Sequence, residues 1–213
     1  MSLDTALTAL TRLRDGNTRY ASNVRSLESM VSHTRRGELA QGQHPVAIVL
    51  GCSDSRVPAE VVFDQGLGDL FVIRVAGNIV APSQIGSVEF AAARFGTRLV
   101  VVMGHSGCGA ITATIEDMRS PSTQSKNIRS IVDRVRPSVQ PLLEADMPAL
   151  DYTTLVHKAV RANVRASCNQ LRHGSELLEQ LAAEEGLLVV GAEYSLDTGL
   201  VDFFEGVPLD SQA

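Results

Sequence analysis

Four short apolar runs alternate with longer segments of helical periodicity, and this alternation constrains the fold more than any other feature of the sequence. The runs are rich in Val, Ile or Leu, each is closed by Gly or a charged residue, and they cover 46–50, 70–73, 99–103 and 187–190. Such runs are typical of strands buried on both faces. Apolar residues recur at helical spacing over 85–95, over 128–135 ahead of Pro137, and over 156–171. Strands that alternate with helices predict a mostly parallel sheet covered by helices on both faces.

The two ends of the chain add to this α/β pattern. The segment 191–206 places Asp-Thr-Gly between two strand-like stretches, which predicts a hairpin with an antiparallel edge strand. At the N-terminus, Leu3, Ala6, Leu7 and Leu10 share one face behind Ser2, which predicts an amphipathic helix outside the alternation. We therefore expect a single α/β domain over 1–213: about four strands plus an antiparallel edge strand, with 1–40 as an N-terminal helical arm.

Net charge and hydropathy exclude some kinds of function. A net charge of -5 argues against nucleic acid or an anionic membrane as the main partner, and the apolar runs are too short to span a bilayer. The first residues lack the features of an export signal, so we expect a cytoplasmic protein. In such a protein, three cysteines indicate metal ligation, catalysis or burial before disulfides.

Metal-capable residues follow two of the four apolar runs. The first run leads into Gly-Cys-Ser-Asp-Ser-Arg with Cys52, and the third leads into Gly-His-Ser-Gly-Cys-Gly with His105 and Cys108. Ligands bind open α/β sheets at the carboxyl ends of strands, where the winding direction switches. If these strands are neighbours across that switch, the three side chains meet. Cys168 instead lies on the apolar stripe of its helix, and we expect it to be buried.

Two thiolates and one imidazole suit zinc, and a catalytic zinc site leaves its fourth position open. Asp54 is placed to accept a proton from water at that position. Arg56 presents a planar fork that can hold the Asp54 carboxylate by two hydrogen bonds and keep it off the metal. Without Arg56, we expect Asp54 to become the fourth zinc ligand in a closed form. The backbone N–H near Gly109 is a candidate donor to an oxyanion.

The motifs Cys-Ser-Asp-Ser-Arg-Val-Pro and Gly-His-Ser-Gly-Cys-Gly-Ala resemble those of the β-class carbonic anhydrases, and the similarity is strongest over about 42–110. The resemblance implies a zinc lyase that interconverts carbon dioxide and bicarbonate through zinc-bound hydroxide. It makes Cys52, His105 and Cys108 the zinc ligands, and Asp54 with Arg56 the pair that controls access to the metal.

The same resemblance suggests how substrate binds. Gln43 matches the glutamine that plant-type members use to donate a hydrogen bond to substrate, and Phe71 and Phe90 match aromatic positions of the substrate pocket, with Phe90 where tyrosine is common. The bicarbonate-regulated subtype is less similar, because its tryptophan beside the first zinc strand is missing and the chain has no Trp. An apolar wall suits carbon dioxide, which is uncharged.

The family's subunit is a Rossmann-like sheet that forms dimers, with a helical arm wrapping the partner and the active site near the interface. The resemblance therefore implies a homodimer or a dimer of dimers, in which Gln43 and the phenylalanines can serve the opposite subunit.

Of three alternatives to this function, the sequence leaves two open. The same site could act on carbon disulfide or carbonyl sulfide. A zinc deaminase would need a His-x-Glu and a Pro-Cys-x-x-Cys pair, and neither occurs in the chain. The protein could also be a non-catalytic zinc-binding module whose thiolates release metal on oxidation.

Overall fold

The computed structural model describes residues 3–24, 33–120, 125–144 and 151–208. Its strands are β1 (Ala47–Gly51), β2 (Leu70–Arg74), β3 (Leu99–His105), β4 (Leu188–Tyr194) and β5 (Val201–Glu205). Its helices are α1 (Leu3–Ala21), α2 (His33–Leu39), α3 (Ala59–Val62), the 3₁₀ turn η2 (Ala76–Asn78), α4 (Pro82–Phe95), α5 (Gly109–Arg119), α6 (Lys126–Glu144), α7 (Tyr152–His173) and α8 (Glu176–Glu185).

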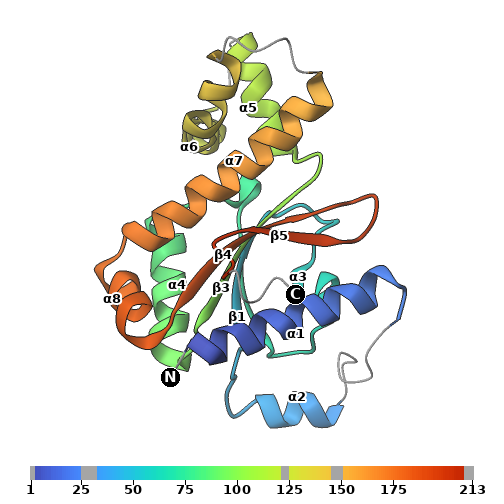
Figure 1. The fold of residues 1–213 in the computed structure, drawn as a ribbon, viewed down its shortest axis with the longest axis vertical. Coiled ribbons are helices and arrows are strands. Elements are labelled where there is room, and N and C mark those ends of the chain that lie inside the picture. The colour runs from blue at the N-terminus through green and yellow to red at the C-terminus, as the bar shows by residue number, and fades with distance from the viewer. Residues whose placement is uncertain (1–2, 25–32, 121–124, 145–150, 209–213) are drawn as a thin grey trace.

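The five strands form one sheet in the order β2-β1-β3-β4-β5 (Figure 1). The first four are parallel, and β5 pairs antiparallel with β4 at one edge. Every residue of β1 and β3 is buried, as expected for central strands that are covered on both faces. The predicted sheet, its antiparallel edge strand and the covering helices are thus confirmed.

Alternate residues of the central strands point to two separate apolar cores. Val49 and Val101 pack with α1 on one face, whereas Ile48 and Val100 pack with α4, α7 and α8 on the other. Helices α1 and α7 accordingly lie on opposite sides of the sheet in Figure 1. A third core joins α5, α6 and the N-terminal half of α7 at one end of the molecule. Both faces of the sheet are therefore covered by apolar packing.

Helix α6 continues beyond the segment predicted to precede Pro137. It runs to Glu144 and includes Pro137 and Pro141. The buried residues Val132, Val135 and Val139 keep the same face past the first proline, and both prolines are exposed. Packing of that apolar face outweighs the hydrogen bonds that the two prolines remove.

Helix α1 packs on the sheet of its own chain, and it does so with the predicted apolar face except for the first residue of that face. Leu3 is 44% exposed, while Ala6, Leu10 and Leu13 are buried. Further along the helix, Gly16 lies so close to α3 that a Cβ would stand 1.9 Å from the Phe63 carbonyl oxygen. That the arm also packs on a partner subunit stays a prediction.

Asn17 fixes the end of α1 to two other parts of the chain. Its Nδ2 donates to the carbonyls of Val62 at 3.1 Å and Gly199 at 2.8 Å, and its Oδ1 accepts from the Val201 N–H at 2.8 Å. The Asn17 side chain is buried, so water could not take over its hydrogen bonds to these three backbone groups.

We expect Asn17→Ala to lower the free energy of unfolding by about 2–3 kcal/mol, because it leaves buried backbone groups without partners. Thr18→Ala is the matched control, since the Thr18 hydroxyl donates only to the Arg14 carbonyl at an exposed position. Urea denaturation of both variants checks this prediction, and equal stability losses would contradict it.

Candidate metal centre

The metal-capable residues meet because β1 and β3 are adjacent parallel strands. Cys52 directly follows β1, and His105 is the last residue of β3. Residues 48–51 of β1 pair with 100–103 of β3, so both strands end at the same edge of the sheet. The winding direction switches between these two strands, because β2 lies on the far side of β1. Cys108 comes three residues after His105, as the N-cap of α5.

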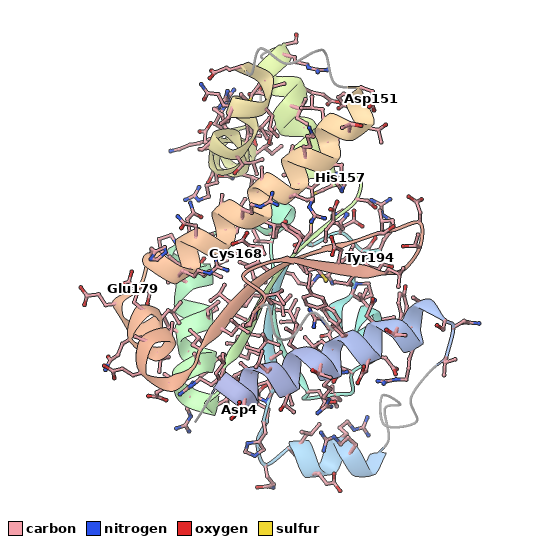
Figure 2. The ribbon with its side chains drawn as sticks, viewed as in Figure 1. Asp4, Asp151, His157, Cys168, Glu179 and Tyr194 are labelled. Carbon is pink, nitrogen blue, oxygen red and sulfur yellow. The ribbon has the colours of Figure 1, made fainter. Side chains whose placement is uncertain are left out.

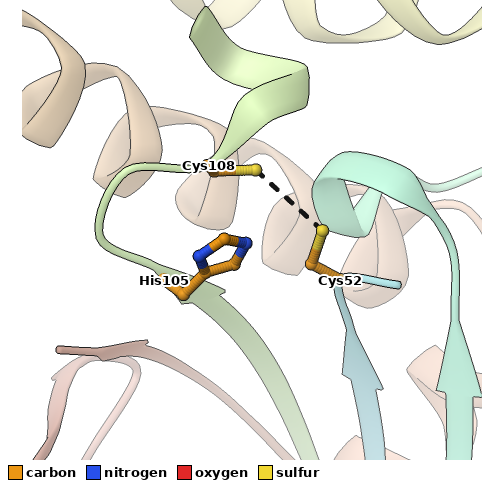
Figure 3. A group of neighbouring side chains, drawn as sticks. All are labelled: Cys52, His105 and Cys108. Atoms are coloured by element: carbon orange, nitrogen blue, oxygen red, sulfur yellow. Dashed lines mark hydrogen bonds between the residues drawn. The ribbon is translucent and has the colours of Figure 1, made fainter. Parts of the chain in front are cut away.

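The three ligand atoms form a compact, buried group. The Cys52 and Cys108 sulfurs and a ring nitrogen of His105 all lie within 4.8 Å of one another, and the two sulfurs are 4.0 Å apart (Figure 3). Sulfurs bound tetrahedrally at about 2.3 Å from zinc are about 3.8 Å apart, so the observed spacing fits this ion. Within the described ranges no other group of three such residues was found.

The imidazole of His105 is oriented as a metal ligand requires. Its Nδ1 lies 3.0 Å from the Ser106 carbonyl oxygen, which can only accept, so Nδ1 carries the proton. Its Nε2 is buried and has no hydrogen-bond partner. A buried nitrogen lone pair without a donor is costly, and a metal ion would satisfy it.

Ser106 is in turn tied to the strand beside β3. Its N–H donates to the Tyr194 carbonyl and its hydroxyl accepts from the Leu196 N–H, both at 2.9 Å. The hairpin of β4 and β5 thereby fixes the carbonyl that orients His105.

The two thiols are arranged to lose protons to a cation. A hydrogen bond from the Cys108 thiol lowers the pKa of Cys52 and raises the pKa of Cys108, so the two sulfurs share one proton. The Gly77 N–H also donates to the Cys52 sulfur at 3.3 Å. A bound metal ion would replace this proton, because thiols ligate as thiolates.

Asp54 and Arg56 form a two-pronged ion pair beside this group. Arg56 Nε donates to Asp54 Oδ1 at 2.9 Å, and Nη2 donates to Oδ2 at 2.7 Å. These hydrogen bonds hold the pKa of Asp54 well below its usual range. Asp54 Oδ2 is 3.8 Å from His105 Nε2, so the ionised carboxylate lies next to the ligand group without belonging to it.

Arg74 supports the loop that carries these residues. At the end of β2, its Nε donates to the Cys52 carbonyl at 3.1 Å and its Nη2 to the Asp54 carbonyl at 2.6 Å. Neither Arg74 in this role nor Gly77 was identified from the sequence. A Gly-Asn pair after the second apolar run signals a turn, but no spacing rule connects it with Cys52.

Of the remaining predicted site residues, Gly109 lies next to a candidate ligand, whereas Gln43, Phe71 and Phe90 lie away from the ligand group. Gly109 is the first residue of α5, so its N–H has no acceptor within the helix. Gln43 precedes β1, whose five residues alone span about 16 Å and separate it from Cys52. Phe71 pairs with Ile48 early in β2, and Phe90 on α4 is 55% exposed.

The two phenylalanines contact each other with ring centroids 6.2 Å apart. They lie at the β2 edge of the sheet, together with Phe95. The structure therefore does not bring Gln43, Phe71 and Phe90 to the metal-ligand group of their own chain.

Comparisons with known proteins agree with this geometry. The family model described as "Carbonic anhydrase" matches residues 47–201. A carbonic anhydrase of Mycolicibacterium smegmatis is 37% identical over 190 residues, which are 89% of each chain. Carbonic anhydrase 2 of Mycobacterium tuberculosis is 35% identical over 187 residues, 88% of this chain and 87% of that protein.

Solved structures show the same fold. A tetrameric β-carbonic anhydrase of Sordaria macrospora superposes with a TM-score of 0.69 at 27% identity, over 79% of this chain and 85% of that one. A Coccomyxa β-carbonic anhydrase in complex with acetazolamide gives 0.70 at 28% identity, over 80% and 77%. The chain therefore belongs to the carbonic anhydrase family, within the β class of these enzymes. In the described part of the chain, no helix is long and apolar enough to cross a membrane.

We expect Cys108→Ser to lose bound metal, because a hydroxyl is a much weaker ligand than a thiolate. Cys168→Ser is the control: Cys168 lies on α7 and is fully buried in another core (Figure 2). Metal analysis of the purified variants tests this, and full metal content in Cys108→Ser would contradict the ligand assignment.

Proposed function

We propose that the protein catalyses the reversible hydration of carbon dioxide to bicarbonate and a proton, with zinc held by Cys52, His105 and Cys108. The observation that carries this proposal is a buried set of three ligands with an ionised carboxylate beside it, clamped by an arginine. Three protein ligands suit a catalytic zinc, whereas structural zinc sites have four. Zinc at this position would supply the Lewis acidity that lowers the pKa of water.

Asp54 acts on the water that reacts. Its Oδ2 receives one hydrogen bond from Arg56 and lies 3.8 Å from His105 Nε2, so it can also accept a hydrogen bond from a water beside the ligands. Because its pKa is low, the carboxylate stays ionised and orients the water by accepting its proton in a hydrogen bond. Arg56 keeps this carboxylate from becoming the fourth ligand.

We expect Arg56→Ala to keep its metal and to lose about 100-fold in turnover, since the released carboxylate is then free to take the water's position. Arg56→Lys keeps the charge without the planar fork and should be intermediate. Stopped-flow carbon dioxide hydration and metal analysis on the same samples check this. Full activity of Arg56→Ala would disprove the gating role.

We further propose that Gln43, Phe71 and Phe90 line the substrate pocket of a partner subunit, while Gly109 donates its N–H to substrate at its own site. Strand β2 is an edge strand, and the aromatic cluster beside it leaves Phe90 more than half exposed. In a two-fold dimer formed across this edge, the β2 strands of the two subunits run antiparallel. The N-terminal ends of the strands in one subunit then lie near the C-terminal ends of the strands in the other subunit. A homodimer, alone or paired into a larger assembly, would then complete each site.

Mixed dimers test this arrangement. One subunit carries Gln43→Ala and the other Arg56→Ala, each variant being defective alone. If Gln43 serves the partner, both changes fall in one site and the second site is wild-type, so activity returns. Activity no higher than that of the single variants would place Gln43 in the site of its own subunit.

A further inference from the structure

The turn η2 between β2 and α4 has an unusual backbone conformation. Gly77 and Asn78 are consecutive residues with positive φ, at 70° and 43°. Glycine adopts this conformation freely, but Asn78 does so at an energetic cost. Space is restricted as well, because a Cβ on Gly77 would stand 3.0 Å from the Ala110 Cβ. A strained turn of this kind persists only where its surroundings hold it in place.

Two buried polar side chains of α7 hold this turn. Asn163 Nδ2 donates to the Gly77 carbonyl at 2.8 Å, and Ser167 Oγ donates to the Asn78 carbonyl at 3.0 Å. Asn163 and Ser167 are only 2% and 3% exposed, and their spacing of four residues puts them on one face of the helix. Burying such groups is unfavourable unless they are bonded, so these two bonds tie the helix to the turn.

Helix α7 is itself fixed against the strand that carries His105. It packs so closely that a Cβ on Gly104 would stand 2.8 Å from Val164 Cγ2. The helix therefore sets the position of η2 relative to the end of β3.

The turn delivers one group to the metal centre, which is the Gly77 N–H that donates to the Cys52 sulfur at 3.3 Å. The carbonyl of the same residue is the one that Asn163 binds. The orientation of Gly77, and with it the N–H···S hydrogen bond, therefore depends on a side chain 86 residues further along the chain.

We propose that Asn163 and Ser167 are positioning residues that tune Cys52 as a metal ligand through the Gly77 amide. This inference rests on the proposed metal site. A hydrogen bond to a thiolate withdraws electron density from the sulfur, so the metal keeps more of its positive charge. That effect matters here because two thiolates neutralise a divalent cation and would otherwise leave it a weak Lewis acid.

Cobalt(II) substitution reports on the electron density of the ligand sulfurs, because it gives a sulfur-to-cobalt charge-transfer band in the absorption spectrum. The set comprises the wild type, Asn163→Leu, Ser167→Ala, Ser167→Thr and, as a matched buried control on the same helix, Cys168→Ala. Absorption spectra, cobalt release to a chelator and thermal unfolding are measured on each protein.

In Asn163→Leu we expect the band to move to longer wavelength, because the sulfur regains electron density. Cobalt binding should weaken about tenfold, because the Gly77 N–H no longer holds Cys52 in place for the metal. Ser167→Ala should show the same changes to a smaller degree, and it keeps the test available if Asn163→Leu does not fold. Ser167→Thr retains the hydroxyl and should match the wild type, as should Cys168→Ala.

Lower thermal stability with an unchanged band and unchanged cobalt release would overturn the inference, since a purely structural role predicts that result. A wild-type protein that binds no cobalt would instead overturn the proposed metal site.

Discussion

The parallel pairing of β1 with β3 is the interaction on which the site depends. It places the residue that follows one strand beside the last residue of the other, although Cys52 and His105 are 53 positions apart in the sequence. Both strands are buried on both faces, so a one-residue slip in register would move every side chain of a strand into the opposite core, where the packing does not fit it. The stability of the core and the geometry of the ligands are therefore set by the same contacts.

Each ligand has its own support from a different part of the fold. His105 is oriented by a carbonyl that the β4–β5 hairpin fixes, and Cys52 receives an N–H from a turn bound to α7. Cys108 is held by its place in the backbone, as the N-cap residue at the start of α5. Supports of this kind orient ligands before the metal arrives, which lowers the cost of ordering them on binding.

The sheet, and the meeting of Cys52, His105 and Cys108 at its edge, could be predicted because their signals are local. Buried runs such as 99–103 stand out by composition, and the motifs at their ends carry the metal-capable residues. Other features depend on tertiary contacts that no local pattern contains. Helix α6 continues through Pro137 because Val139 packs in the core, and Asn163 looks like any polar residue of a helix until its contact with Gly77 is seen.

The position of Gln43 at the opposite end of β1 from Cys52 has a consequence for how activity arises during biogenesis. On the proposed assignment, a newly folded monomer would already have all three metal ligands and the Asp54–Arg56 ion pair, and so could bind the metal by itself. On the proposed arrangement, however, the monomer lacks the part of the carbon dioxide pocket that a second subunit supplies. Metal binding and catalytic activity would then arise in separate steps. Metal binding would need one subunit only, whereas activity would depend on the subunit concentration, because it requires dimerisation.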